Sequence, residues 1–239
     1  GKFRSGLGRW YAVADLAGPR AGAVSAERAA LGWTKHLLRL GGVLTKALAQ
    51  AYSPFGWDVH YAALTRLEEL GLVTRGLLVR GIRTLQFAEK ETAARLAEPD
   101  FGGGGAVPPG DMVVVSSADP ANPYGLTVDW PAEGDAAAVR FARRPDNHLL
   151  LGSGRFLLWA AAGGRHIAAV DPRIAADAGA CAECVRFLAR NLIRERGQRK
   201  VAVESLNGKP VGGTELAERL VRLGAEKEGD AFVFWPSAL

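Results

Sequence analysis

Residues 42–89 decide the first half of the fold, and their sequence is GVLTKALAQAYSPFGWDVHYAALTRLEELGLVTRGLLVRGIRTLQFAE. A short extended piece leads to Thr45, which can cap a short helix, and SPFG then interrupts the chain. Residues 57–71 predict a longer helix that stops at Gly71. The apolar stripe that we expect this helix to bury consists of Val59, Ala63, Leu67 and Leu70.

The residues on either side complete a recognisable order of elements. Upstream, residues 25–42 predict a helix that begins at Ser25 and ends at Gly41-Gly42, with Leu31, Leu37, Leu38 and Leu40 on its apolar side. Downstream, residues 72–89 predict two strands around a turn. Helix, short strand, helix, helix, strand, wing and strand is the winged form of the helix-turn-helix.

A segment rich in glycine and proline separates this part from the remainder of the chain. Residues 97–111, AEPDFGGGGAVPPGD, cannot form a regular helix or a central strand. We therefore predict four regions: an N-terminal extension (1–20), a winged-helix domain (21–98), a Gly/Pro-rich linker (99–110) and a second domain (111–239).

The second domain has a different pattern. Short apolar segments with glycine-rich turns predict strands near 111–118, 136–142, 147–154, 155–164 and 165–170. Helix, strand, helix and strand follow over 177–235. The expected fold class is α+β, with a winged-helix domain followed by a small antiparallel sheet or partial β-barrel domain with two packed helices.

Composition excludes several classes of protein. No apolar run of about 18 residues occurs, so we expect no membrane span. The first ten residues lack the apolar core of a secretory signal. With two cysteines, a disulfide framework is not expected and a reducing cytoplasm is the expected location. Because the chain does not begin with Met, we expect it to be part of a longer protein.

The charge is unevenly distributed along the chain. Residues 1–96 contain 14 Lys and Arg against 7 Asp and Glu, a balance of +7, whereas residues 97–239 contain 16 against 18, a balance of −2. The first half is therefore the part expected to face a polyanion. A solvated basic surface without a partner is the alternative.

Motifs for catalysis or metal binding are scarce. Cys181 and Cys184 lack the further ligands that zinc requires, and we expect them to be buried thiols. No G-x-x-x-x-G-K-[ST] phosphate loop and no G-x-S-x-G nucleophile elbow occurs. We predict no metal site and no ATP hydrolysis by this chain alone.

Two groups of residues in the first domain could contact nucleic acid. Trp57 and Tyr61 lead the helix predicted to be the recognition helix and could stack on unpaired bases; alternatively, they pack on the neighbouring helix. Arg75, Arg80 and Arg83 belong to the predicted hairpin and could contact phosphates. A hairpin that is merely solvated is the alternative for the arginines.

The loop SSADPANPYG at 116–125 follows an apolar strand and allows two interpretations. Structurally, Asp119 can accept a hydrogen bond from its own downstream backbone, and the prolines stiffen the corner that joins the sheet to the winged helix. Functionally, Asn122 and Tyr124 could read and stack a flipped base beside the Asp119 carboxylate. We favour the structural interpretation.

Several of these motifs, taken in order, resemble the C-terminal region of the large helicase-related (Lhr) family of ATP-dependent DNA helicases. The resemblance covers residues 8–170 and rests on Gly8-Arg9-Trp10, the winged-helix segment, Gln86-Phe87-Ala88 and the Ala118–Asn122 loop. It implies a DNA-binding part of a helicase whose motor domains, with ATP and Mg²⁺, lie N-terminal to this region. We expect no cofactor in this chain.

The resemblance also adds candidate residues. The nucleic-acid-binding set becomes Arg9, Trp10, Trp57, Tyr61, Arg75, Arg80, Arg83, Gln86, Asn122 and Tyr124. Some relatives of this region resemble DNA glycosylases with an essential aspartate. No position here matches that aspartate, and Asp119 is the candidate catalytic residue.

The main prediction is thus a DNA-binding accessory region of an Lhr-type helicase. The alternatives are a DNA glycosylase module and an assembly module that binds another subunit or the motor. Expected partners are single-stranded or forked DNA and the motor domains, with homo-oligomers as a further possibility and no membrane.

Overall fold

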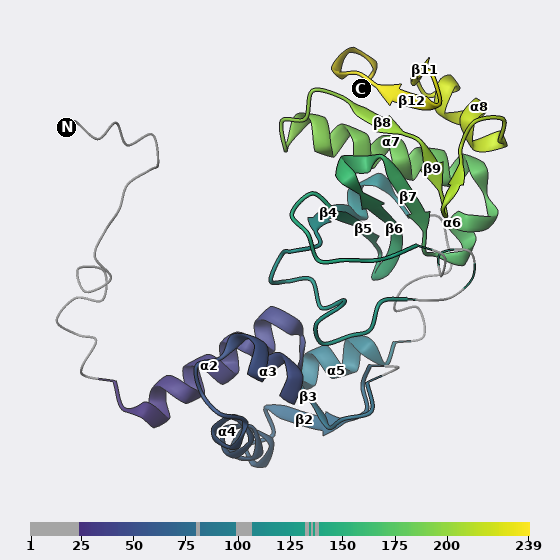
Figure 1. Cartoon of the computed structure of the whole chain (residues 1–239). Coiled ribbons are helices and arrows are strands. Elements are labelled where there is room, and N and C mark those ends of the chain that lie inside the picture. The colour runs from purple at the N-terminus through teal and green to yellow at the C-terminus, as the bar shows by residue number, and fades with distance from the viewer. Residues whose placement is uncertain (1–23, 80–81, 99–106, 132–133, 135, 137–138) are drawn as a thin grey trace, which may run out of the picture.

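The computed structural model describes residues 24–79, 82–98, 107–131, 134, 136 and 139–239 (Figure 1). The predicted N-terminal extension, most of the predicted linker, and the candidate residues Arg9, Trp10 and Arg80 lie outside these ranges. The described part of the predicted linker is ordered against the second half of the chain, where Val107 packs on the core.

The first part of the structure is a winged helix, as predicted. Its elements are α2 (Ala26–Gly41), β1 (Val43–Thr45), α3 (Lys46–Tyr52), α4 (Trp57–Glu69), β2 (Val73–Gly76), β3 (Gln86–Glu89) and α5 (Lys90–Leu96). The three strands form an antiparallel sheet in the order β1-β3-β2. Helix α5, which the sequence pattern did not predict, follows the wing directly.

Local signals define the ends of these helices. The Ser25 hydroxyl accepts a hydrogen bond from the backbone N–H of Arg28, and the Thr45 hydroxyl accepts one from Leu48. Each cap satisfies a donor that the first turn of a helix would leave unpaired. Gly71 follows α4 with a φ of 73°, a conformation that glycine adopts without steric cost.

The core of the winged helix consists of apolar side chains with the addition of polar His60, which is fully buried. Buried leucines of α2 and α4, including Leu37, Leu38 and Leu64, surround Phe87 of β3. The predicted stripe on α4 was wrong in part, because the buried residues are His60, Leu64 and Leu67, whereas Leu70 is 65% exposed. Apolar spacing alone misplaced the stripe, since polar His60 occupies a core position.

The second part of the chain contains two sheets and three α-helices among the residues described. Its strands are β4 (Met112–Ser116), β5 (His148–Gly152), β6 (Arg155–Ala161), β7 (His166–Ala169), β8 (Val201–Val203), β9 (Ser205–Leu206), β10 (Lys209–Pro210), β11 (Glu226–Glu228) and β12 (Ala231–Phe234). Its helices are α6 (Pro172–Ala176), α7 (Ala178–Arg194) and α8 (Glu215–Arg222). The α+β class is confirmed.

The larger sheet is open. It has six strands in the order β10-β9-β7-β6-β5-β4, and its two edges do not pair to close a barrel. The pairing is antiparallel except between β7 and β9, which are parallel. The second sheet has the order β11-β12-β8. The expected small antiparallel sheet is thus present as a mainly antiparallel six-stranded sheet beside a separate three-stranded sheet, and the described strands form no closed barrel.

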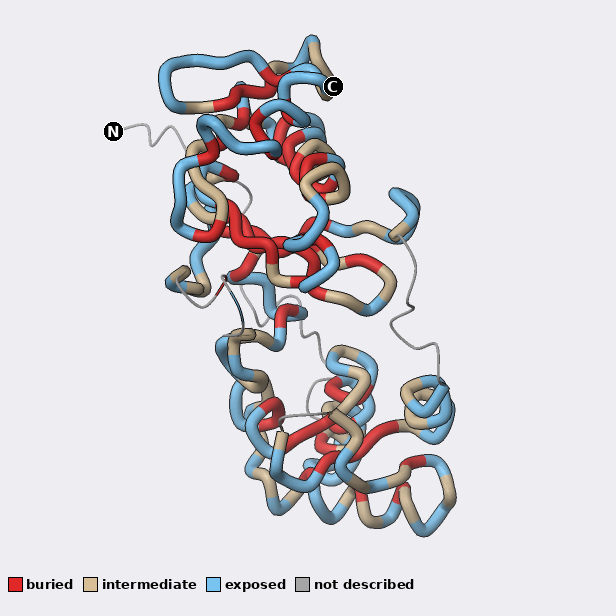
Figure 2. Tube along the Cα trace, turned by 90° about the vertical axis from the view of Figure 1, so that its right-hand side faces the viewer, coloured by how far each residue is buried: buried red, intermediate tan, exposed pale blue. Residues whose placement is uncertain are grey.

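The two faces of the six-stranded sheet bury different residues, because successive side chains of a strand point to opposite faces. Leu150 and Leu158 face the core that also contains α7, whose Cys181 and Cys184 are buried as predicted. On the other face, Leu149 and Trp159 pack with aromatic residues from the segments around residues 124–141. Figure 2 shows buried stretches in both parts of the chain.

The strand expected at residues 136–142 is absent from its described positions 139–142. Phe141 instead lies in an irregular segment, with its ring 5.3 Å from that of Trp159 and 5.5 Å from that of Trp130. Packing against the sheet face therefore replaces pairing at the sheet edge. No helix of the described residues is long and apolar enough to cross a membrane.

Candidate nucleic-acid interface

The aromatic residues at the start of α4 pack against the wing strand. The rings of Trp57 and Tyr61 lie 6.3 and 6.0 Å from the ring of Phe87 in β3. Their aromatic neighbour is thus a residue of a strand, and Trp57 also packs against the core of the winged helix, which includes leucines of α2. Tyr61 remains 38% exposed, so one edge of this cluster faces solvent.

His60 anchors α4 through a network of hydrogen bonds. Its Nδ1 lies 2.8 Å from Thr34 Oγ1, and its Nε2 lies 2.6 Å from Ser53 Oγ. Because Thr34 donates its own hydroxyl proton to the carbonyl of Ala30, we assign the proton of the neutral imidazole to Nδ1. Ser53 then donates to Nε2 while its oxygen accepts from the N–H of Phe55. All polar groups in the network are satisfied by a neutral His60.

The environment of His60 favours this neutral form. Burial lowers the pKa of His60, and the nearby Asp58 carboxylate opposes this effect only in part. Neutral His60 therefore connects α4 both to α2, through Thr34, and to the turn before α4, through Ser53. No apolar periodicity could have indicated this role.

Gln86 organises the wing from within. Its side-chain oxygen accepts hydrogen bonds from the N–H groups of Leu78 and Val79 at 3.0 and 2.7 Å, and its amide donates to the carbonyl of Ile82 at 2.8 Å. The side chain is fully buried. This geometry favours a structural role for Gln86 over the predicted DNA contact.

The wing arginines lie in different positions. Arg75 belongs to β2, not to the tip of the hairpin, and forms an ion pair of 3.0 Å with Glu68 of α4. Arg83 lies in the exposed part of the wing. Arg83 is therefore the described arginine best placed for an external anion, since an exposed ion pair already engages Arg75.

The wing and α4 also carry exposed apolar residues. Leu77 and Leu85 adjoin the last pair of the hairpin, Gly76 and Gln86, and are 74% and 39% exposed. We use the name apolar wing patch for these two leucines and Tyr61, whose ring packs on Phe87 of β3. Exposed apolar residues can contribute to interaction surfaces, and sequence reasoning missed the two leucines because they continue a predicted strand pattern.

The loop after β4 is a closed structural unit. The Asp119 carboxylate accepts a hydrogen bond of 2.8 Å from the N–H of Ala121, which is the turn that the sequence predicted. Asn122 is buried, donates to the carbonyl of Ser117 at 2.8 Å and accepts from the N–H of Tyr124 at 3.0 Å. Its amide is therefore used inside the loop and is not available to read a base.

Arg143 holds this loop from a distant part of the chain. Its guanidinium donates to the carbonyls of Asn122, Tyr124 and Asp119 at 2.6, 3.0 and 2.9 Å. The Asp119 carbonyl also accepts a hydrogen bond of 3.0 Å from the N–H of Asn122, so Arg143 adds to the bonds within the loop. No local pattern could have indicated this contact, because the arginine follows the loop by about twenty residues.

Tyr124 belongs to the aromatic core on the face of the sheet. Its ring lies 4.9 Å from Phe156 and stacks on Trp130 at 6.0 Å. Burial raises the pKa of its phenol. The next residue is Gly125, with a φ of 71°, and a Cβ there would lie 2.3 Å from Nε1 of Trp130. Tyr124 therefore packs in the aromatic core, and Gly125 leaves room for the ring of Trp130.

The structure thus separates the candidate residues into two groups. Trp57, Tyr61, Arg75, Arg83 and Gln86 lie on α4 and the wing. Asp119, Asn122 and Tyr124 lie in the loop after β4. Among the described residues no group of three or more His, Cys, Asp or Glu side chains could hold a metal ion.

The order and pairing of α2–β3 define a winged-helix protein with an additional α+β part. Residues 23–104 match the family model described as "Large helicase-related protein, winged-helix domain". The chain belongs to the large helicase-related (Lhr) family and corresponds to a C-terminal region of it.

Two curated relatives support this assignment. The chain is 34% identical over 161 residues to "Lhr helicase/ probable uracil glycosylase" of Mycolicibacterium smegmatis, which covers 67% of this chain and 10% of that protein. It is 29% identical over 127 residues to "Lhr helicase/uracil glycosylase" of Escherichia coli, covering 53% of this chain and 8% of the relative. The matched region is about a tenth of the length of these relatives.

Proposed function

We propose that this chain is a DNA-binding accessory region of an Lhr-type ATP-dependent DNA helicase. The observation that carries the proposal is the exposed part of α4 and the wing, which presents Arg83 and the residues of the apolar wing patch to solvent. An arginine can neutralise a phosphate while apolar and aromatic groups contact unpaired bases. ATP and Mg²⁺ then act in the motor domains.

The interior of the winged helix supports this surface. His60 fixes the recognition helix to α2, and Gln86 fixes the two sides of the wing. Such internal hydrogen bonds keep a contact surface in one arrangement before its ligand arrives, which lowers the entropic cost of binding. Single-stranded or forked DNA is the expected ligand, because the apolar wing patch can contact the faces of unpaired bases, which a fully stacked duplex does not expose.

The test is equilibrium binding of the chain to single-stranded, forked and duplex DNA over a series of salt concentrations. Arg83→Glu should weaken binding to all three and reduce the slope of log K against log salt by about 0.7–0.9. Tyr61→Ala should weaken binding to the single strand and the fork more than to the duplex. Arg222→Glu on α8 is the control with the same change of charge. Wild-type affinity and slope for Arg83→Glu would rule out the wing as a contact.

A glycosylase is the second candidate function, since the names of both relatives include uracil glycosylase. In the described loop, however, Asn122 and Tyr124 are used for internal contacts, and Asp119 accepts a backbone hydrogen bond. Excision of uracil from a single strand, measured with wild-type chain and Asp119→Asn, tests whether this loop carries such chemistry.

A further inference from the structure

A strongly basic segment lies within the otherwise slightly acidic second half of the chain. Residues 186–200, RFLARNLIRERGQRK, contain six Lys and Arg and one Glu, a balance of +5. Residues 97–239 as a whole have a balance of −2. The positive charge of this half is therefore concentrated at the end of α7 and in the turn that follows it.

Three of these arginines follow one side of α7. Arg186, Arg190 and Arg194 recur at every fourth residue, so they lie above one another at intervals of about 6 Å along the helix. We call them, together with Phe187, the α7 arginine ridge. Arg190 and Arg194 are exposed, and Arg186 is half-buried.

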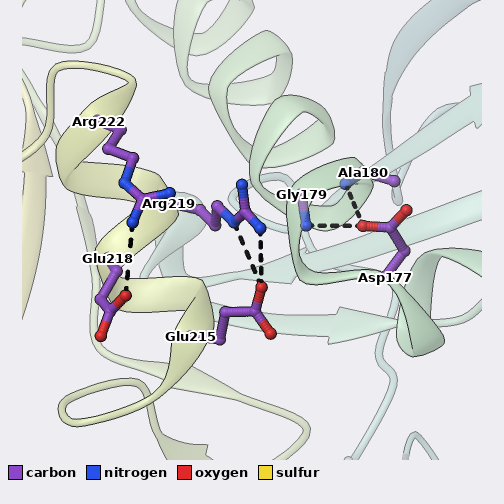
Figure 3. A network of polar contacts seen from close by, with 7 residues as sticks. All are labelled: Asp177, Gly179, Ala180, Glu215, Glu218, Arg219 and Arg222. Carbon is purple, nitrogen blue, oxygen red and sulfur yellow. Dashed lines mark hydrogen bonds and ion pairs between the residues drawn. The ribbon is translucent and has the colours of Figure 1, made fainter.

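The opposite side of α7 fixes the helix in place. Cys184, Leu188 and Leu192 are buried in the main core. At the first turn, the Asp177 carboxylate accepts hydrogen bonds from the N–H groups of Gly179 and Ala180 at 2.8 and 3.0 Å (Figure 3). The arginine ridge is thus presented by a rigid helix.

Helix α8 provides a contrast. Its arginines form ion pairs with glutamates one turn earlier, Arg219 with Glu215 at 3.0 Å and Arg222 with Glu218 at 3.7 Å (Figure 3). On α7, none of the described carboxylates lies within 4.0 Å of the guanidinium of Arg186 or Arg190, and Arg194 donates to the backbone carbonyl of Leu239. Glu183 and Glu195 line the same surface hollows as the ridge, but neither forms an ion pair with Arg186 or Arg190 in the described structure.

The ridge also borders two hollows of the surface. Phe187 and Arg190 line both of them; Arg186 and Met112 belong to one, and Arg194 to the other. Phe187 is half-buried, packs against the main core and lines both hollows together with Arg190. Guanidinium groups beside an aromatic ring suit a strand whose phosphates and bases need separate partners.

We propose that the α7 arginine ridge binds the sugar–phosphate backbone of a nucleic-acid strand, as a second contact surface in addition to α4 and the wing. The inference rests on the proposed function for the choice of DNA as ligand. Rows of arginine with no carboxylate partner gain most from polyanions, because each contact releases counterions from the strand. The ridge extends the contact of the region beyond the winged helix.

The experiment uses the full chain and a fluorescent thymidine 20-mer. Arg186→Gln/Arg190→Gln should reduce the affinity about tenfold at low salt and lower the slope of log K against log salt by about 1.4, for two single-strand contacts. Arg219→Gln/Arg222→Gln on α8 removes the same charge and should bind like wild type. Arg190→Gln alone, at an exposed position, provides a milder variant should thermal melting show that the double variant is destabilised.

The outcomes distinguish this inference from the proposed function. If Arg83→Gln loses binding and the ridge variants bind like wild type, the ridge is not a DNA contact and the winged-helix proposal stands. If the ridge variants lose binding and Arg83→Gln binds like wild type, the ridge is a DNA contact and the wing is not. Equal losses in the α7 and α8 variants would show an effect of net charge only and overturn the ridge. A ridge that binds an acidic protein segment in place of DNA would leave the affinity for the 20-mer unchanged.

Discussion

The phenol of Tyr52 donates a hydrogen bond of 2.8 Å to the carbonyl oxygen of Pro120. Tyr52 ends α3 of the winged helix, whereas Pro120 lies in the loop after β4, so the bond joins residues 68 positions apart. Arg143 holds the carbonyls of the same loop from the other part of the chain. The Asp-Pro loop is therefore the described element that connects the winged helix to the six-stranded sheet by a side-chain hydrogen bond.

Tyr52→Phe should loosen this connection without disturbing either core. The substitution removes one hydroxyl and keeps the ring, so we expect a loss of stability of about 1 kcal/mol or less. Hydrogen exchange of the loop amides of Ala121 and Asn122 should become faster. Tyr61→Phe is the control, because the Tyr61 hydroxyl makes no hydrogen bond with the described residues. Unchanged exchange in Tyr52→Phe would mean that the bond does not restrain the loop.

Asp119→Ala should lower the free energy of unfolding by about 0.5–1.5 kcal/mol, because the N–H of Ala121 loses its acceptor. Asp119→Asn should lose less, since an amide oxygen can accept the same bond. Thermal melts of the three proteins measure this order. Uracil excision assayed in parallel separates the two roles, as a stable Asn variant that has lost a wild-type excision activity would assign Asp119 to catalysis.

Arg143→Met should destabilise the loop more strongly. It removes three hydrogen bonds to loop carbonyls while keeping much of the apolar stem, and a charged hydrogen bond contributes about 1.5–3 kcal/mol in a protected setting. Because the arginine is half-buried, we expect a loss near the lower value. Arg144→Met is the matched control, since Arg144 contributes its backbone N–H to Ser117 and its side chain is exposed. Equal melting temperatures for the two variants would contradict this role.

The stability of the winged helix should depend on the protonation of His60. Burial lowers the folded-state pKa of His60 below its ordinary value of 6.5, so the folded state binds a proton less readily than the unfolded state does. The stability that the folded protein gains from neutral His60 is complete above pH 6.5 and is lost as the pH falls from 6.5 toward the lowered pKa. The melting temperature should therefore decrease between pH 7.5 and pH 5.5.

A variant isolates this effect, because burial also lowers the pKa of His148 in the second part of the chain. His60→Gln should be less stable at all pH values, since the hydroxyls of Thr34 and Ser53 lose a well-placed partner. The melting temperature of this variant should also decrease less between pH 7.5 and pH 5.5 than that of the wild type. An equal decrease in both proteins would mean that His60 does not change its charge on unfolding in this range.

Local sequence signals determined the elements of this protein. Ser25 and Thr45 cap the helices predicted from them, Gly71 follows α4 in the conformation that ends a helix, and the order of helices and strands identifies the winged helix. Short apolar segments with glycine-rich turns likewise located β5, β6 and β7. These features depend on neighbours within a few residues, so periodicity and capping chemistry suffice to predict them.

Only the tertiary structure decided which side chains serve packing and which remain available. His60 enters the core because Thr34 and Ser53, from other elements, satisfy both ring nitrogens. Phe141 lies in an irregular segment and not in an edge strand, because its ring packs on the aromatic surface formed by Trp159 and Trp130. In the same way Gln86, Asn122 and Tyr124 are used internally, whereas Leu77 and Leu85 remain exposed.

The physical reason is the range of the interactions. A helix cap is completed by an N–H group two or three residues away, but the partners of Arg143 and Tyr52 lie 19–24 and 68 residues away and meet only after the chain has folded. A buried polar group is stable only where such partners converge, because an unpaired one costs about 1–3 kcal/mol. The sequence therefore determined most of the elements and their order, and the long-range contacts decided which residues form the surface that we propose binds DNA.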